Sequence, residues 1–143
     1  MPAFTATAPG KIILFGEHAV VYGEPALAAP VTSVRARAVV SPRLNAAQGE
    51  ILLEAPDVGI SQTLRNLPGR HPLRAIVEEL TALLEMPRFP ACTIQITSTI
   101  PISSGLGSGA AVSAAVAKAL AGFVGTPLTT DQLSSVIFEI EKI

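Results

Sequence analysis

The sequence has one cysteine, few charged residues and no excess of positive charge, and each shortage narrows the class of protein. A single cysteine, Cys92, cannot form an internal disulfide, so we expect a protein of a reducing compartment such as the cytoplasm. Cys92 itself is expected to be a small buried side chain in a strand rather than a reactive thiol. The formal net charge is −1 and the arginines form no run, so nucleic acid is not an expected partner.

Long apolar runs are also missing. The longest uncharged stretch, residues 89–117, contains Pro90, Pro101 and several glycines near its end. A membrane-spanning helix needs roughly 20 unbroken apolar residues. The N-terminus lacks a basic segment followed by an apolar run, so we expect neither a signal peptide nor a membrane partner.

The sequence is rich in apolar residues, which make up 49% of its 143 residues, whereas charged residues make up 15%. This composition predicts one domain with two buried layers, or a piece of a larger protein with an exposed apolar face. Hydrophobic periodicity predicts an α+β fold in which strands come first and helices later. The predicted strands cover residues 4–8, 11–15, 34–40, 51–54 and 92–100, and the predicted helices cover 72–85, 110–124 and 131–143. We expect a turn at Pro9-Gly10 and irregular structure over residues 56–69.

A glycine-rich loop, residues 101–110 (PISSGLGSGA), follows the last predicted strand and opens a helix. Glycines leave backbone N–H groups unshielded, and the start of a helix adds unpaired N–H donors and the positive end of its dipole. Three serine hydroxyls add further donors. Together these groups predict a cradle for a phosphate chain.

Three interpretations of this loop compete. The first is a flexible connection between a strand and a helix. The second is a dinucleotide fingerprint, because Gly105, Gly107 and Ala110 fit G-x-G-x-x-A, although residues 101–104 separate the glycines from the strand. The third is an ATP loop. A Walker loop is excluded, because no Gly-Lys-Ser/Thr follows the glycines.

Two motifs support the ATP loop by resemblance to a family. The loop is similar to the P-x-x-x-G-L-G-S-S-A motif of the GHMP family of small-molecule kinases, with Gly109 where the second serine is usual. Residues 8–28, which read APGKIILFGEHAVVYGEPALA, resemble the first motif of that family in the form found in kinases that act on mevalonate. Two long motifs in the right order and separation are more specific than either alone.

The resemblance implies a GHMP kinase N-terminal domain of the ribosomal protein S5 domain 2-like type, a mixed sheet with helices on one side. Residues 1–143 would form this ATP-binding domain, with its end and the whole C-terminal domain absent. The implied activity is ATP-dependent phosphorylation of mevalonate, with ATP and Mg²⁺ as cofactors. A homodimer, another acceptor such as phosphomevalonate, and a non-catalytic nucleotide-binding module remain open.

Lys11, Glu17 and His18 are the residues that the first motif singles out. Lys11 is either an edge-strand lysine that discourages aggregation or, as the resemblance implies, a catalytic and substrate-binding cation beside the acceptor hydroxyl. The resemblance implies that Glu17 and His18 line the acceptor pocket and orient Lys11. From the residues alone, they are a solvated loop pair.

Nucleotide and metal contacts are also implied by the resemblance. Asp57, where the family usually has asparagine, and Ser98 would contact the nucleotide, although Asp57 reads equally well as an exposed turn residue. The loop residues implied to hold the nucleotide are Ser103, Ser104, Gly105, Leu106, Gly107, Ser108 and Gly109. Glu141 matches an acidic Mg²⁺ ligand, with Ser108 or water replacing the usual serine, and otherwise is a surface glutamate. The family's catalytic aspartate would follow roughly ten residues after Glu141, so this chain alone is expected to be inactive.

Overall fold

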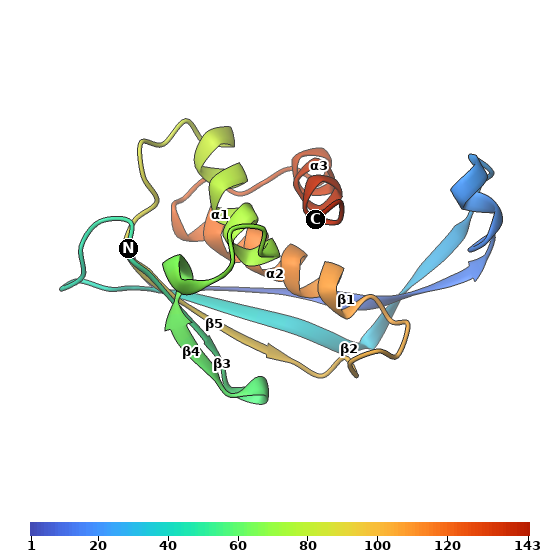
Figure 1. Cartoon of the computed structure of the whole chain (residues 1–143), viewed down its shortest axis with the longest axis horizontal. Helices are drawn as coiled ribbons and strands as arrows, with labels where there is room; N and C mark the ends of the chain where they lie inside the picture. The colour runs from blue at the N-terminus through green and yellow to red at the C-terminus, as the bar shows by residue number, and fades with distance from the viewer.

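The computed structural model describes residues 1–143 as a mixed sheet covered by α-helices (Figure 1). The strands are β1 (Phe4–Phe15), β2 (Leu27–Pro42), β3 (Ile51–Ala55), β4 (Ile60–Thr63) and β5 (Cys92–Ser98). The helices are α1 (Pro72–Leu83), α2 (Ser108–Phe123) and α3 (Thr130–Ile140). Short 3-10 helices form η1 (Ala19–Tyr22), η2 (Pro56–Val58) and η3 (Leu64–Asn66). The sheet order is β1-β2-β5-β3-β4, with β3 and β5 parallel and the other neighbours antiparallel.

All three α-helices lie on one face of the sheet, as the family resemblance implies (Figure 1). Helix α2 lies directly on β1 and β2, while α1 and α3 pack against α2. Small side chains let α2 approach the sheet closely. The helix buries Ala111, Ala115, Val116, Ala117, Ala119 and Leu120. In the sheet, Val40, Leu53 and Ile94 are fully buried. The α+β prediction and its mixed sheet are confirmed.

Strand β1 is longer than the sequence predicts. It runs from Phe4 to Phe15 without a turn, although Pro9 and Gly10 lie in its middle. β1 is an edge strand, where a proline is tolerated because it removes no interior ladder hydrogen bond. The pairing with β2 shifts instead, so that Pro9 lies opposite Arg35 but Gly10 lies opposite Val31. The predicted turn at Pro9-Gly10 is therefore wrong.

Strand β4 also differs from the prediction. Residues 60–63 lie in the segment that is expected to be irregular. They are few and mostly polar, so they give no clear strand pattern. They form a strand through antiparallel pairing with Leu52–Ala55 of β3. Helix α1 lies between β4 and β5, in agreement with the helix predicted over residues 72–85 and the strand predicted over residues 92–100.

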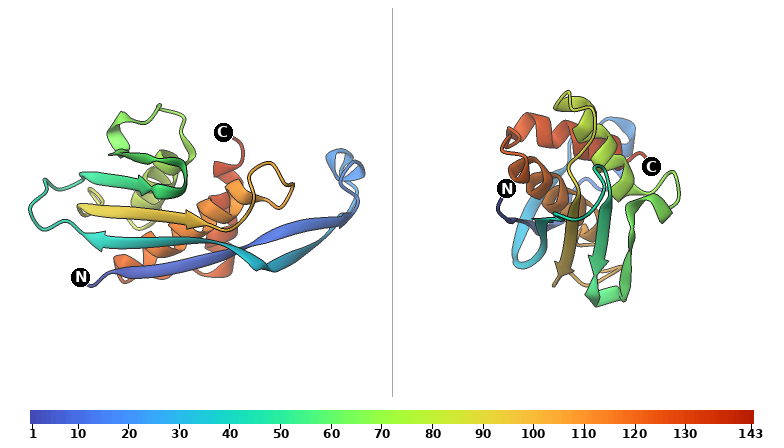
Figure 2. Two further views of the ribbon diagram at one scale, coloured as in Figure 1. Left: turned by 90° about the horizontal axis from the view of Figure 1, so that it is seen from below. Right: turned by 90° about the vertical axis from the view of Figure 1, so that its left-hand side faces the viewer.

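Beyond Gly10 and Val31, β1 and β2 leave the helices and form a two-stranded arm, residues 11–30, that ends in η1 (Figure 2). The arm carries large apolar side chains that are between 42% and 87% exposed. They are Ile12, Leu14, Phe15, Val20, Val21, Tyr22 and Leu27. Among the helices, none has both the length and the hydropathy needed to cross a bilayer.

Candidate active site

The glycine loop presents a row of backbone N–H groups with no acceptor in the protein. From Ile102 to Ala110, no backbone N–H donates a hydrogen bond within the chain. Ser103, Gly105 and Gly107 have φ angles of 59°, 74° and 66°. Left-handed residues alternating with right-handed ones turn successive N–H groups toward one side, which makes a concave anion site. Helix α2 begins at Ser108, within the loop, and adds the positive end of its dipole.

The loop is docked on β1 through a main-chain hydrogen bond. The backbone N–H of Lys11 donates to the carbonyl oxygen of Leu106 at 2.9 Å. A β-carbon at Gly10 would lie only 3.2 Å from that oxygen and 3.1 Å from Val34 Cγ2, so glycine permits this close approach. From the sequence alone Gly10 is expected in a turn, so this role is not predicted. A glycine within a strand is the signal that indicates a close backbone approach.

Lys11 itself lies across the glycine loop. A β-carbon at Gly107 would be 2.9 Å from both Cγ and Cε of Lys11, so the lysine stem occupies the space that a side chain would need. The Lys11 ammonium takes part in none of the ion pairs, and the residue is exposed. The structure therefore brings the two sequence motifs together and leaves the charge of Lys11 free beside the N–H groups.

The three loop serines differ in what they can offer a ligand. The Ser104 hydroxyl donates to the Pro101 carbonyl oxygen at 2.7 Å, so it stabilises the loop and keeps only its lone pairs free. Ser103 is exposed in its left-handed conformation. Ser108, the first residue of α2, is partly buried and makes no side-chain hydrogen bond. Ser108 and Ser103 are thus the available hydroxyl donors.

Asp57 and Ser98 lie together at the end of β5. The Asp57 carboxylate accepts a hydrogen bond from the Ser98 backbone N–H at 2.9 Å. The Ser98 hydroxyl oxygen in turn accepts from the Ile100 backbone N–H at 3.2 Å. Asp57 thus ties η2, the turn between β3 and β4, to the strand that leads into the glycine loop.

Glu17 and His18 are not brought to the glycine loop. Both are exposed at the tip of the arm, where His18 precedes η1. The four residue steps from Lys11 to Phe15, where β1 ends, correspond to about 13 Å of extended strand, and Glu17 and His18 follow beyond that end. No hydrogen bond or ion pair links Glu17 or His18 to Lys11. In this structure, neither residue orients the Lys11 side chain.

Glu141 lies at the C-terminal end of α3, exposed and without an ion pair. A carboxylate and a hydroxyl are the hard oxygen ligands that Mg²⁺ prefers, so Glu141 and Ser108 fit this metal by chemistry. No group of three or more His, Cys, Asp or Glu side chains could hold a metal ion by itself. Mg²⁺ would therefore need water and phosphate oxygens for its remaining positions, which is its usual mode of binding.

Comparisons with known proteins show the family and the fold of the chain. A family model described as the GHMP kinases N terminal domain matches residues 71–143. A mevalonate kinase of Thermococcus sibiricus is 34% identical over 151 aligned residues, covering 96% of this chain and 44% of that protein. A mevalonate kinase of Archaeoglobus fulgidus is 43% identical over 115 residues, covering 80% of this chain and 36% of that protein.

A solved structure with a similar fold supports the same family. The crystal structure of the Methanococcus jannaschii mevalonate kinase superposes with a TM-score of 0.83 at 28% identity, covering 96% of this chain and 45% of that one. The chain thus spans less than half the length of the curated relatives it matches. The family model, which covers half of the sequence, and the shared fold lead to one conclusion: the chain belongs to the GHMP kinases and carries their N-terminal domain.

Proposed function

We propose that this chain is the nucleotide-binding N-terminal domain of a mevalonate kinase, which transfers the γ-phosphoryl group of ATP to the primary hydroxyl of mevalonate. The observation that carries the proposal is the Lys11 stem packed across Gly107, beside the free N–H groups of the glycine loop. A cation in contact with a nest of backbone donors suits a triphosphate and an acceptor oxygen together. Relatives named mevalonate kinase that align with 96% of the chain support the choice of acceptor.

Each part of the site has a distinct task in this proposal. The N–H groups of residues 102–110 bind the phosphate oxygens and position the γ-phosphorus for in-line attack. The mevalonate oxygen bonds to that phosphorus as the bond to the bridging oxygen breaks and ADP departs. Lys11 stabilises negative charge on the acceptor oxygen and the transferred group. The hydroxyl proton goes to a base, the aspartate of the family motif, which this chain does not contain.

Mg²⁺ would neutralise charge between the β- and γ-phosphates when bound. Ser108 and Glu141 are the residues that would hold it. Both have free oxygen atoms, and Ser108 opens the helix on which the phosphates would rest.

The exposed arm supports the proposal that the chain is one domain of a larger enzyme. Its apolar side chains gather on the part of β1 and β2 that the helices do not cover. Apolar surface of this kind marks a protein interface more often than a free surface. The same arm carries Glu17 and His18, so a domain packed there would meet the residues proposed to line the mevalonate pocket.

The test is Lys11→Ala in an enzyme that joins this chain to the second half found in its relatives. We expect kcat to fall by at least about 100-fold and the KM for ATP to change by less than about threefold, because the lost charge acts on the transferred group. The matched control is Lys118→Ala. Lys118 lies on α2, and its ammonium donates to the Thr7 carbonyl oxygen of β1 at 2.9 Å. An unchanged kcat for Lys11→Ala would remove this residue from the chemistry.

The acceptor is tested by measuring ADP release with mevalonate, phosphomevalonate and galactose. Turnover with mevalonate alone is expected, and preferential turnover with either other acceptor would replace the proposed substrate. ATP binding without turnover of any acceptor would favour a non-catalytic nucleotide-binding module. The isolated 143-residue chain is expected to give no turnover, because it lacks the base.

A further inference from the structure

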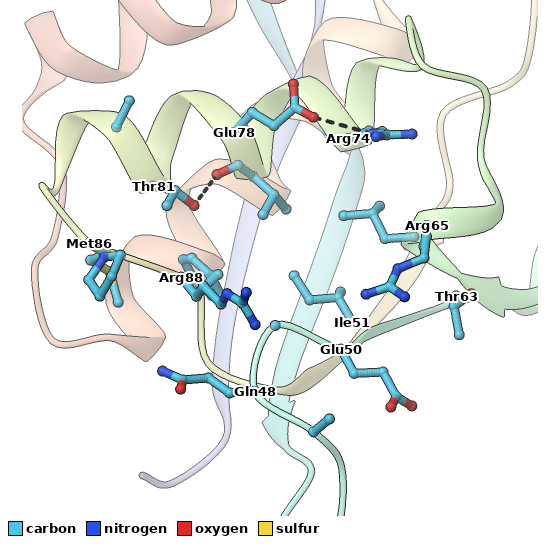
Figure 3. Close-up of a pocket in the computed structure, with 17 residues that line it drawn as sticks. Gln48, Glu50, Ile51, Thr63, Arg65, Arg74, Glu78, Thr81, Met86 and Arg88 are labelled. Carbon is cyan, nitrogen blue, oxygen red and sulfur yellow. Dashed lines mark hydrogen bonds and ion pairs between the residues drawn. The ribbon is translucent and has the colours of Figure 1, made fainter.

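A second hollow lies at the opposite end of the sheet from the glycine loop (Figure 3). Its volume is about 840 Å³, within the usual range for small-ligand sites. The turn before β3, the end of β4, one side of α1 and the loop before β5 line it. Strand β5 leads from this hollow to the glycine loop and spans about 20 Å. The hollow is therefore separate from the proposed ATP site.

Positive charge in this hollow exceeds what its carboxylates balance. Arg74 pairs with Glu78 at 3.2 Å, and Glu50 pairs with the adjacent Arg43 at 2.7 Å. Arg65 and Arg88 take part in no ion pair and no hydrogen bond.

The two unpaired arginines face one another. Figure 3 shows the guanidinium groups of Arg65 and Arg88 pointing toward each other across Ile51. The stem of Arg88 runs beside Gly49, where a β-carbon would lie 3.7 Å from Arg88 Cδ. Gly49 has a φ of 85° in the turn before β3, a backbone conformation that favours glycine.

The floor of the hollow is apolar. Ile51, Val77 and Phe89 are buried beneath it, and Met86 is partly exposed at its side. Phe89 is only 3% exposed and offers no face on which a nucleobase could stack. An anion with a compact apolar body fits this lining better than a nucleotide does.

We propose that this hollow binds a small organic phosphate monoester. The phosphate lies between Arg65 and Arg88, and the apolar body rests against Met86, above the buried Ile51. Guanidinium groups match phosphate oxygens in bidentate geometry, which makes arginine a preferred phosphate ligand. Two unpaired cations also match the charge of a phosphate monoester, which approaches −2 at neutral pH, better than the single charge of a carboxylate.

The experiment is calorimetric titration of the full chain with phenyl phosphate, in the presence of a saturating non-hydrolysable ATP analogue. The analogue occupies the proposed ATP site, so heat from phenyl phosphate reports the second hollow. We expect one site, with Arg65→Gln and Arg88→Gln each weakening binding by about tenfold and the double variant abolishing it. Arg37→Gln, an exposed arginine on β2, is the matched control and is expected to bind as the parent does.

Three further ligands test which chemical groups the hollow recognises. Inorganic phosphate and benzoate are each expected to bind at least about threefold more weakly, and phenol not at all. Equal binding of inorganic phosphate or of benzoate would overturn the assignment to an organic phosphate. Phenyl phosphate affinity that is unchanged in both arginine variants, with melting temperatures equal to the parent's, would overturn the site itself.

Discussion

At the scale of single residues, two glycines determine where Lys11 lies. Gly10 lets the Leu106 carbonyl reach the backbone of β1, and Gly107 leaves space for the lysine stem. The sequence predicts Lys11 and the glycine loop as candidates, because both stand in long motifs. It cannot predict their contact, which depends on how β5 and β1 place the two segments across β2.

Gly107→Ala is expected to lower the free energy of unfolding by about 1–2 kcal/mol and to weaken ATP binding. The new β-carbon would meet the Lys11 stem at 2.9 Å, and a φ of 66° is unfavourable for alanine. Urea unfolding and nucleotide titration measure the two effects.

Gly109→Ala is the matched control for the stability effect. Gly109 lies inside α2, its φ is not positive, and nothing lies within 4 Å of an added β-carbon. Alanine there should leave stability unchanged or raise it by up to about 1 kcal/mol, because it favours the helix. Equal losses of stability in both variants would contradict the contact between Gly107 and Lys11.

At the scale of elements, the parts that the sequence predicts are those with their own periodicity. Helix α1 begins at Pro72 and α3 is capped by Thr129 and Gln132, as their local signals indicate. Strand β4 exists only because β3 offers it a partner, and Pro9 stays in a strand only because β1 is at the edge. Pairing of this kind is a tertiary property that a local pattern does not contain.

The tie between η2 and β5 is an element-scale contact that can be tested. Asp57→Ala removes the acceptor of the Ser98 N–H, so we expect stability to fall by about 1 kcal/mol and the Ser98 amide to exchange faster with solvent. Asp57→Asn keeps an oxygen at the same position and should lose less than half as much. Unchanged exchange at Ser98 in the alanine variant would show that this bond does not hold the end of β5.

At the scale of the whole molecule, Cys92 lies in the fully buried part of the core that the sheet and the helices form. It opens β5, opposite Pro42 of β2 and Ile51 of β3, and is 0% exposed. Burial raises the pKa of the thiol from 9.0 to about 12, and the positive charge of Arg43 opposes this shift only in part. The expected buried cysteine in a strand is confirmed, and its ionisation is coupled to unfolding of the core.

This coupling predicts how stability depends on pH. In the unfolded chain the thiol loses its proton near pH 9, whereas the folded protein keeps it until about pH 12. The folded state therefore binds more protons between these values, and stability falls as pH rises, by up to about 1.4 kcal/mol per unit. Cys92→Ala has no thiol, so its urea-unfolding free energy should fall less steeply between pH 8.5 and about 10.5. Lysine and tyrosine titrations occur in both proteins and cancel in the difference, so parallel profiles would mean that solvent reaches Cys92 without global unfolding.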